Sequence, residues 1–191
     1  MKLCVLFPGV GYTVDKPLLY YTGKMFQKEG YTLLQMKYHD LPEKIRGDRE
    51  KMELTFRIAM KQVEARLVDV DFREYEDVVF VGKSIGTVLA AAYARTHGRS
   101  KVRFIYMTPL KDTFIYAPPK NGLAFHGTAD PWAETPVIRE ACERLSIPLY
   151  TYSDANHSLE TGDVMTDIRA AEDVLTKIRD MFFGEDQTKR L

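Results

Sequence analysis

The chain has 191 residues, of which 45% are hydrophobic and 28% are charged. This size and composition are typical of a globular protein with one domain that buries its own core. The 27 Lys and Arg residues balance the 27 Asp and Glu residues, which argues against nucleic acid or an anionic membrane surface as the main partner.

The sequence contains neither a recognisable targeting segment nor a cysteine pattern typical of disulfide bonds. The apolar run after Met1 stops at Pro8-Gly9, too short for a signal peptide, and no stretch approaches the roughly 20 apolar residues of a membrane span. Cys4 and Cys142 lie far apart and belong to no metal-ligand spacing. We therefore expect a reduced, cytoplasmic protein without a membrane span.

Short apolar runs alternate with segments of helical periodicity along the chain. The runs, each interpreted as a strand, are Leu3–Phe7, Tyr31–Met36, Val78–Val81, Val102–Met107, Leu123–Phe125 and Leu149–Tyr152. Helices are predicted from Pro17 to Gly30, after Asp48, from Ile85 to His97, from Thr135 to Leu145 and from Val164 to Phe182, and the stretch Leu110–Asn121 is expected to be irregular. The alternation predicts an α/β domain over 1–184, with about six mostly parallel strands and helices on both faces, followed by a polar tail at 185–191.

Ligands of such a sheet bind beyond the carboxyl ends of its strands, and the most informative motif lies at one of these ends. Gly82-Lys83-Ser84-Ile85-Gly86 matches Gly-x-Ser-x-Gly between a predicted strand and a predicted helix. The turn is so tight that the residues flanking the serine must be small, because larger side chains would collide with neighbouring backbone. The turn places the Ser84 hydroxyl above the edge of the sheet. The N–H of Ile85, at the start of the helix, points into the same space.

A serine becomes nucleophilic only beside a base, and the base needs an acid to orient it. His157 follows the sixth predicted strand and is the candidate base, and Asp130 follows the fifth and is the candidate acid. Asp154, three residues before the histidine, competes for the role of acid, with the alternative that it only forms a turn. The other histidines are weaker candidates: His126 for a structural hydrogen bond, His39 for a pocket wall and His97 for a helix end.

Two nucleotide-binding interpretations fail. Gly82-Lys83-Ser84 resembles the end of a phosphate-binding loop, but Asp77 stands where that loop requires glycine. Val14 likewise replaces the third glycine of a dinucleotide-binding pattern that begins at Gly9. We therefore expect no nucleotide, metal or other cofactor.

The elbow at 82–86, the segment His-Gly-x-x-Asp-Pro at 126–131 and the chain order Ser84, Asp130, His157 resemble the α/β-hydrolase family in a small form without a cap domain. The resemblance extends over residues 2–183 and implies that the first two of the family's usual eight strands are absent. It also implies a second oxyanion-binding N–H from the turn after the first strand. That turn reads Pro8-Gly9-Val10-Gly11-Tyr12 instead of beginning His-Gly, and we expect Val10 to be the donor, with Gly11 as the alternative.

These residues together predict a serine hydrolase that cleaves a carboxylic ester or thioester of a small-molecule acyl substrate through an acyl-enzyme. Tyr12, Phe114, Tyr116 and Trp132 are expected to line the acyl pocket, unless they only cover the sheet edge. Two alternatives stay open. The same triad can transfer the acyl group to an acceptor other than water, and a hydrolase-like fold with a misaligned triad can serve as a binding module.

Overall fold

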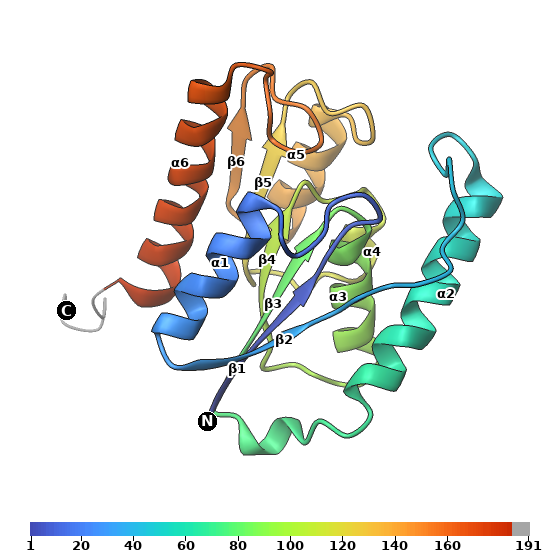
Figure 1. The fold of residues 1–191 in the computed structure, drawn as a ribbon, viewed down its shortest axis with the longest axis vertical. Coiled ribbons are helices and arrows are strands. Elements are labelled where there is room, and N and C mark those ends of the chain that lie inside the picture. The colour runs from blue at the N-terminus through green and yellow to red at the C-terminus, as the bar shows by residue number, and fades with distance from the viewer. Residues whose placement is uncertain (185–191) are drawn as a thin grey trace.

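The computed structural model describes residues 1–184, and its centre is one parallel β-sheet (Figure 1). The strands are β1 (Lys2–Phe7), β2 (Tyr31–Gln35), β3 (Asp77–Lys83), β4 (Arg103–Met107), β5 (Leu123–Gly127) and β6 (Leu149–Tyr152). They lie in the order β2-β1-β3-β4-β5-β6, and every neighbouring pair is parallel. The predicted six-stranded α/β architecture is confirmed, while the predicted tail at 185–191 lies outside the described residues.

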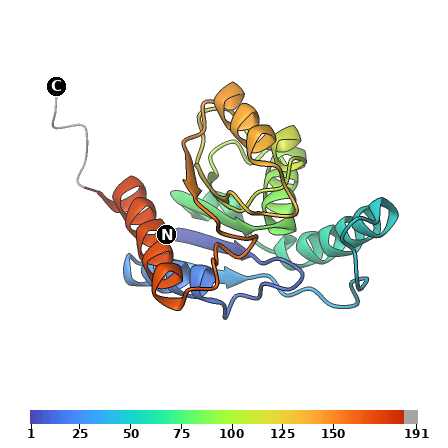
Figure 2. The ribbon, with the colours of Figure 1, turned by 90° about the horizontal axis from the view of Figure 1, so that it is seen from above.

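Helices cover both faces of the sheet, as the view from above shows (Figure 2). They are α1 (Pro17–Lys28), α2 (Arg49–Leu67), α3 (Ile85–Thr96), α4 (Thr113–Tyr116), α5 (Thr135–Leu145) and α6 (Val164–Phe183), with one 3₁₀ turn, η1 (Phe72–Glu74). The buried residues of α1 and α6 share one core cluster, and those of α2, α3 and α5 share the other. Within residues 1–184, none of the helices combines the length and apolar character needed to cross a bilayer.

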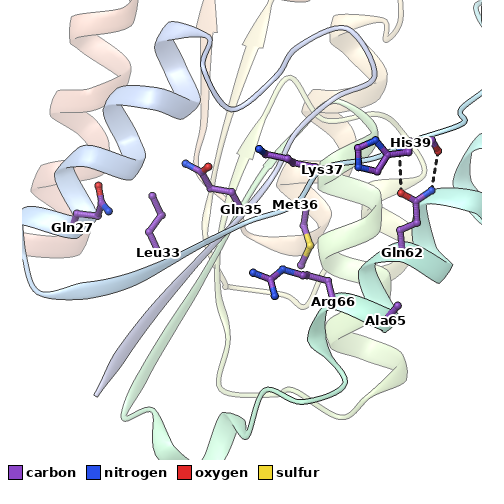
Figure 3. A pocket seen from close by; sticks show the side chains of 9 residues that line it. All are labelled: Gln27, Leu33, Gln35, Met36, Lys37, His39, Gln62, Ala65 and Arg66. Atoms are coloured by element: carbon purple, nitrogen blue, oxygen red, sulfur yellow. Dashed lines mark hydrogen bonds between the residues drawn. The ribbon is translucent and has the colours of Figure 1, made fainter.

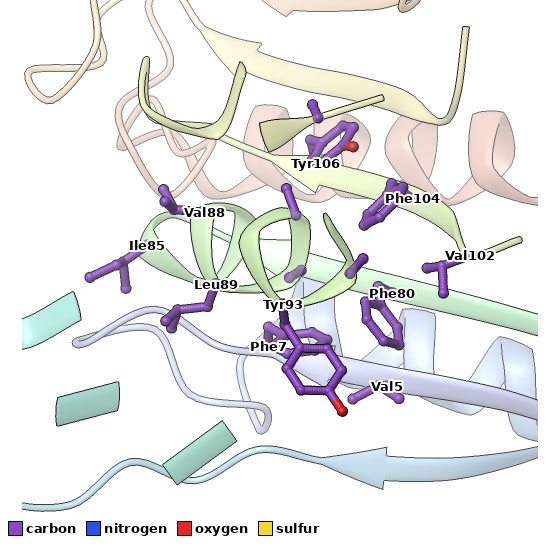
Figure 4. Close-up of a cluster of buried hydrophobic side chains, with 14 of the residues drawn as sticks. Val5, Phe7, Phe80, Ile85, Val88, Leu89, Tyr93, Val102, Phe104 and Tyr106 are labelled. Carbon is purple, nitrogen blue, oxygen red and sulfur yellow. The ribbon is translucent and has the colours of Figure 1, made fainter. Parts of the chain in front are cut away.

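The helix α3 is fixed against the sheet more completely than any surface helix would be. Ten of its residues are buried, and its alanines let the backbone approach the strands closely. Leu89 and Tyr93 pack on the same face as Phe80 and Phe104 of the adjacent strands (Figure 4). Because α3 cannot shift without opening this core, the turn that precedes it is held in one place.

Most of the predicted segments differ from the structure by one or two residues at a boundary. The second strand ends at Gln35 rather than Met36, and the fifth extends to Gly127. The stretch 110–121, expected to be irregular, contains the helical turn α4. This turn forms because Phe114 is buried and the Thr113 hydroxyl bonds the Thr87 hydroxyl of α3 at 2.6 Å, contacts that local periodicity cannot indicate.

Candidate active site

The serine motif forms the sharp connection between β3 and α3. Ser84 has φ = 56°, a left-handed conformation that is costly for any residue with a Cβ. A Cβ on Gly82 would lie 2.6 Å from Cα of Thr87, and one on Gly86 would lie 2.0 Å from the carbonyl oxygen of Phe7. Both flanking glycines are thus required by close backbone approach, and the turn presents the serine at the carboxyl edge of the sheet.

The structure brings the serine, the histidine and the aspartate into one chain of hydrogen bonds. His157 Nε2 lies 2.7 Å from Ser84 Oγ, and His157 Nδ1 lies 2.6 Å from Asp130 Oδ2. The other oxygen of Asp130 accepts the backbone N–H of Trp132 at 2.8 Å. Since a carboxylate only accepts, Nδ1 carries the proton, and Nε2 is left to accept from the serine hydroxyl.

The surroundings of His157 favour the neutral form of its ring. Burial is the largest influence and lowers the pKa of His157 from its ordinary value of 6.5, and the nearby charge of Lys83 acts in the same direction. The hydrogen bond to Asp130 opposes both. Trp132 contributes to the burial, since its indole stacks on the imidazole with ring centroids 5.5 Å apart. A neutral, oriented imidazole can accept a proton from a neighbouring hydroxyl.

The loops that carry the acid and the base are bonded to each other. The N–H of Ala129 donates to the carbonyl of Ala155 at 3.0 Å, and the N–H of Asp154 donates to the Thr128 hydroxyl at 2.9 Å. A Cβ on Gly127 would lie 2.2 Å from the Ala155 oxygen, so these loops need a glycine where they meet. Asp154, the competing acid, is exposed with φ = 57°, and the imidazole bonds Asp130 instead.

The remaining histidines lie outside this chain of bonds. His126 Nε2 bonds the Thr135 hydroxyl at 3.0 Å, and its Nδ1 stays 3.9 Å from Asp130. His97 caps the end of α3 and stacks on Tyr93. His39 lines a separate hollow, described below.

Two expected oxyanion donors lie close to the serine in the fold. Ile85 is the first residue of α3, and its N–H therefore has no acceptor within the helix. In the turn after β1, the N–H of Gly9 donates to the carbonyl of Tyr12 at 3.1 Å, and Val10 and Gly11 line the cleft beside Ser84. Within residues 1–184, the N–H groups of Val10 and Gly11 donate to no other backbone group, so both residues stay candidates for the second oxyanion donor.

A cleft of about 990 Å³ opens beside Ser84 and His157. Its walls come from the β1 turn, the first half of α2, the start of α3 and the segment 110–116. Tyr12, Tyr116 and Trp132 line it, but Phe114 does not. The expectation for Phe114 is corrected because α4 turns this ring away from the cleft, where it is 4% exposed and packs near Tyr106.

A second hollow, of about 830 Å³, lies between β2 and α2 (Figure 3). It shares no lining residue with the cleft, and it holds His39 but no serine or cysteine. The backbone of His39 exchanges two 2.9 Å hydrogen bonds with the Gln62 amide, which joins the loop to α2. Among residues 1–184, no group of three or more His, Cys, Asp or Glu side chains is arranged to hold a metal ion.

Lys83 has no role in the sequence motif, but the structure places it beside the triad. Its side chain is fully buried, and Nζ donates to the Thr108 hydroxyl at 2.5 Å and to the His157 carbonyl at 2.6 Å. The ammonium also lies 4.8 Å from the centroid of the Tyr12 ring. The signal available in the sequence was a charged residue at the end of an otherwise apolar buried strand.

Solved structures with the same fold are numerous, although no family model and no curated protein matches the chain. A serine hydrolase homologue from Coxiella burnetii is 16% identical, with a TM-score of 0.65 over 93% of this chain and 85% of its own. A serine hydrolase without a lid from Xanthomonas campestris is 14% identical, with a TM-score of 0.62 over 94% and 81%.

An esterase from Thermogutta terrifontis, solved after phosphorylation by paraoxon, is 18% identical, with a TM-score of 0.58 over 97% of this chain and 85% of its own. At these identities the similarity establishes the fold and leaves the reaction to the site itself. The chain therefore has the α/β-hydrolase fold, in a small, six-stranded form.

Proposed function

We propose that the protein is a serine hydrolase that cleaves carboxylic esters or thioesters of small molecules. One observation carries the proposal. Ser84, His157 and Asp130 form a continuous hydrogen-bonded chain, with distances of 2.7 and 2.6 Å, and Ser84 and His157 line an open cleft. These distances, and the burial of Asp130, support the roles of nucleophile for Ser84, base for His157 and acid for Asp130. Several solved structures with the same fold are described as serine hydrolases or esterases, which supports the proposal.

The reaction would proceed in two halves. Ser84 Oγ attacks the substrate carbonyl while His157 Nε2 takes its proton, and Asp130 stabilises the imidazolium that forms. The N–H groups of Ile85 and Val10, or Gly11 in place of Val10, stabilise the oxyanion, each typically by about 3 kcal/mol. The imidazolium then protonates the departing alcohol or thiol. Water attacks the acyl-enzyme with His157 again as the base, which releases the carboxylic acid and restores the serine.

The apolar wall of the cleft is the proposed site for the acyl chain. Beyond the serine it is formed by residues of α2, α3 and the 110–116 segment, namely Met52, Phe56, Ile85, Val88, Leu110 and Ile115. These side chains suit an acyl group longer than acetate. Tyr116 and Trp132 lie on the same cleft and would contact the ester group or the leaving group.

Two other functions use the same fold. Acyl transfer to an alcohol or amine would need only that an acceptor replace water in the second half-reaction. A binding module would be expected to have a disassembled triad, and the 2.7 Å separation of Ser84 Oγ and His157 Nε2 counts against it.

The test is reaction with a fluorophosphonate probe, with the adduct located by peptide mass spectrometry. We expect an adduct on Ser84 in the wild type, none in Ser84→Ala, and a rate lowered by about 10³ or more in His157→Ala. Ser158→Ala is a matched control, because Ser158 lines the same cleft but bonds neither His157 nor Asp130 through its hydroxyl. A folded wild-type protein that gives no adduct would exclude the proposal.

A further inference from the structure

A lysine that is entirely buried is rare, because removing an ammonium from water costs several kcal/mol unless its bonds replace the lost hydration. Lys83 is 0% exposed and directly precedes the serine. Two of its three N–H donors are used, one by the Thr108 hydroxyl and one by the His157 carbonyl. The ammonium also lies over the face of the Tyr12 ring, with Nζ 4.8 Å from the ring centroid. The site is therefore built to hold this side chain.

The partners of Lys83 belong to different strands of the sheet. Thr108 follows β4, and His157 lies on the loop after β6, 74 residues along the chain from the lysine. The single Nζ atom thus connects the ends of three strands. Only one of these connections reaches the triad, and it does so through the backbone oxygen of the residue whose ring must face Ser84.

Backbone strain is found where these partners lie, as it is at five other non-glycine residues of 1–184. Ser84 has φ = 56° and Thr108 has φ = 43°, a conformation that is especially unfavourable for a β-branched residue. Leu159, two residues after the histidine, has φ = 61°. Such conformations persist only where surrounding contacts impose them, and the bonds of Lys83 are contacts of this kind.

We propose that Lys83 is a positioning residue: its Nζ, bonded to the His157 carbonyl and the Thr108 hydroxyl, holds the loop of the histidine so that the imidazole stays at hydrogen-bond distance from Ser84. The inference rests on the proposed function for its catalytic meaning. The structural part, that the lysine fixes the loop, can be tested without it.

The charge of the lysine has a second consequence. The acidic groups that attract it are Asp130 and Glu160, while burial has the larger, opposite effect and lowers the pKa of Lys83 to about 7. Below that pH the ammonium is charged and opposes protonation of His157, which is one reason why the pKa of the imidazole is lowered. Removal of the lysine should therefore raise the pKa of His157.

The experiment compares the wild type with Lys83→Met, which keeps an unbranched side chain, shorter by one atom, and removes its donors. Lys24→Met is the matched control, since Lys24 also lies over a tyrosine ring, 5.7 Å from the centroid of Tyr20, but on α1. The rate of fluorophosphonate reaction is measured against probe concentration and pH. Hydrogen exchange of the 156–160 backbone is measured in parallel.

We expect Lys83→Met to lower the limiting rate of reaction about 10- to 100-fold, with the half-saturating probe concentration within about twofold of the wild type. The acidic limb of the pH profile should move to higher pH, and the 156–160 amides should exchange faster. Lys24→Met should change none of these. A lysine that only fills space would leave the acidic limb where it is.

A folded Lys83→Met protein with the wild-type limiting rate and acidic limb would overturn the inference. Should that variant not fold, Thr108→Val decides, because it removes one anchor of Nζ while keeping the branched shape. The inference then requires that Thr108→Val lower the limiting rate while the half-saturating probe concentration stays near that of the wild type. A limiting rate equal to that of the wild type contradicts it. If the wild type itself does not react, the proposed function fails, and hydrogen exchange alone decides whether Lys83 fixes the loop.

Discussion

The two sides of the cleft are built differently. On the side of the strand ends, hydrogen bonds of 2.6 to 2.7 Å join His157 to Ser84, Lys83 and Asp130. On the side of α2, the neighbouring Gly47 has no atom within 4 Å of an added Cβ, and a hollow of about 830 Å³ separates part of the helix from β2. The comparison indicates that the reacting groups are held by many contacts, whereas the wall for the substrate has room to adapt.

The largest expected effect lies on the strand-end side. Asp130→Asn should lower kcat for an ester substrate by about 10⁴, because an amide in place of the carboxylate no longer fixes the proton on Nδ1 of the imidazole. The corresponding change at the competing position, Asp154→Asn, should leave kcat within about twofold, since Asn tolerates the left-handed conformation found there. Steady-state kinetics of the two folded variants test this prediction. Equal losses of kcat in both variants would show that the assignment of Asp130 as the acid is wrong.

Gly86 and Gly11 both follow strands at the edge of the cleft, and they test through stability how closely the turn before α3 is packed. A Cβ at Gly86 would lie 2.0 Å from a carbonyl oxygen of β1, whereas one at Gly11 meets nothing within 4 Å. Gly86→Ala should therefore lower the free energy of unfolding by about 3 kcal/mol or more, and Gly11→Ala should change it by less than about 0.5 kcal/mol. Urea unfolding measures both. Similar losses in the two variants would contradict the close backbone approach at Gly86.

The sequence permitted the fold and the triad to be predicted for one physical reason. The carboxyl ends of parallel strands meet at one edge, so residues after the third, fifth and sixth apolar runs come together whatever their distance along the chain. The same reasoning could not find the bond from Lys83 to His157, because it depends on a side chain that passes through the core to a backbone oxygen 74 residues away. Phe114 was misplaced since one turn of helix has too few residues to show which face is buried.

Burial of Lys83 should also be visible as a pH dependence of stability. Its pKa is lowered to about 7 in the folded protein, from 10.5, so between these values the unfolded chain binds the proton that the folded chain has released. The free energy of unfolding therefore rises with pH through this window, by at most about 1.4 kcal/mol per pH unit. From pH 7.5 to 9, the wild type should gain about 2 kcal/mol relative to Lys83→Met. Urea titrations at both pH values measure the difference, and parallel curves for the two proteins would refute it.

The smallest expected effect lies on the α2 side. Met52 lines the cleft and is half-buried, while Leu54, on the same helix, is 41% exposed and does not line it. Met52→Ala removes apolar contact worth about 1 kcal/mol from an acyl chain that reaches this wall, which corresponds to about a fivefold rise in KM for an octanoate ester. An acetate ester, too short to reach the helix, should keep its KM, and Leu54→Ala should leave both substrates unchanged. Because kcat depends on the strand-end side alone, it should stay constant throughout. A fall in kcat with Met52→Ala would mean that α2 also positions the reacting groups, and the two sides of the cleft would then not be independent.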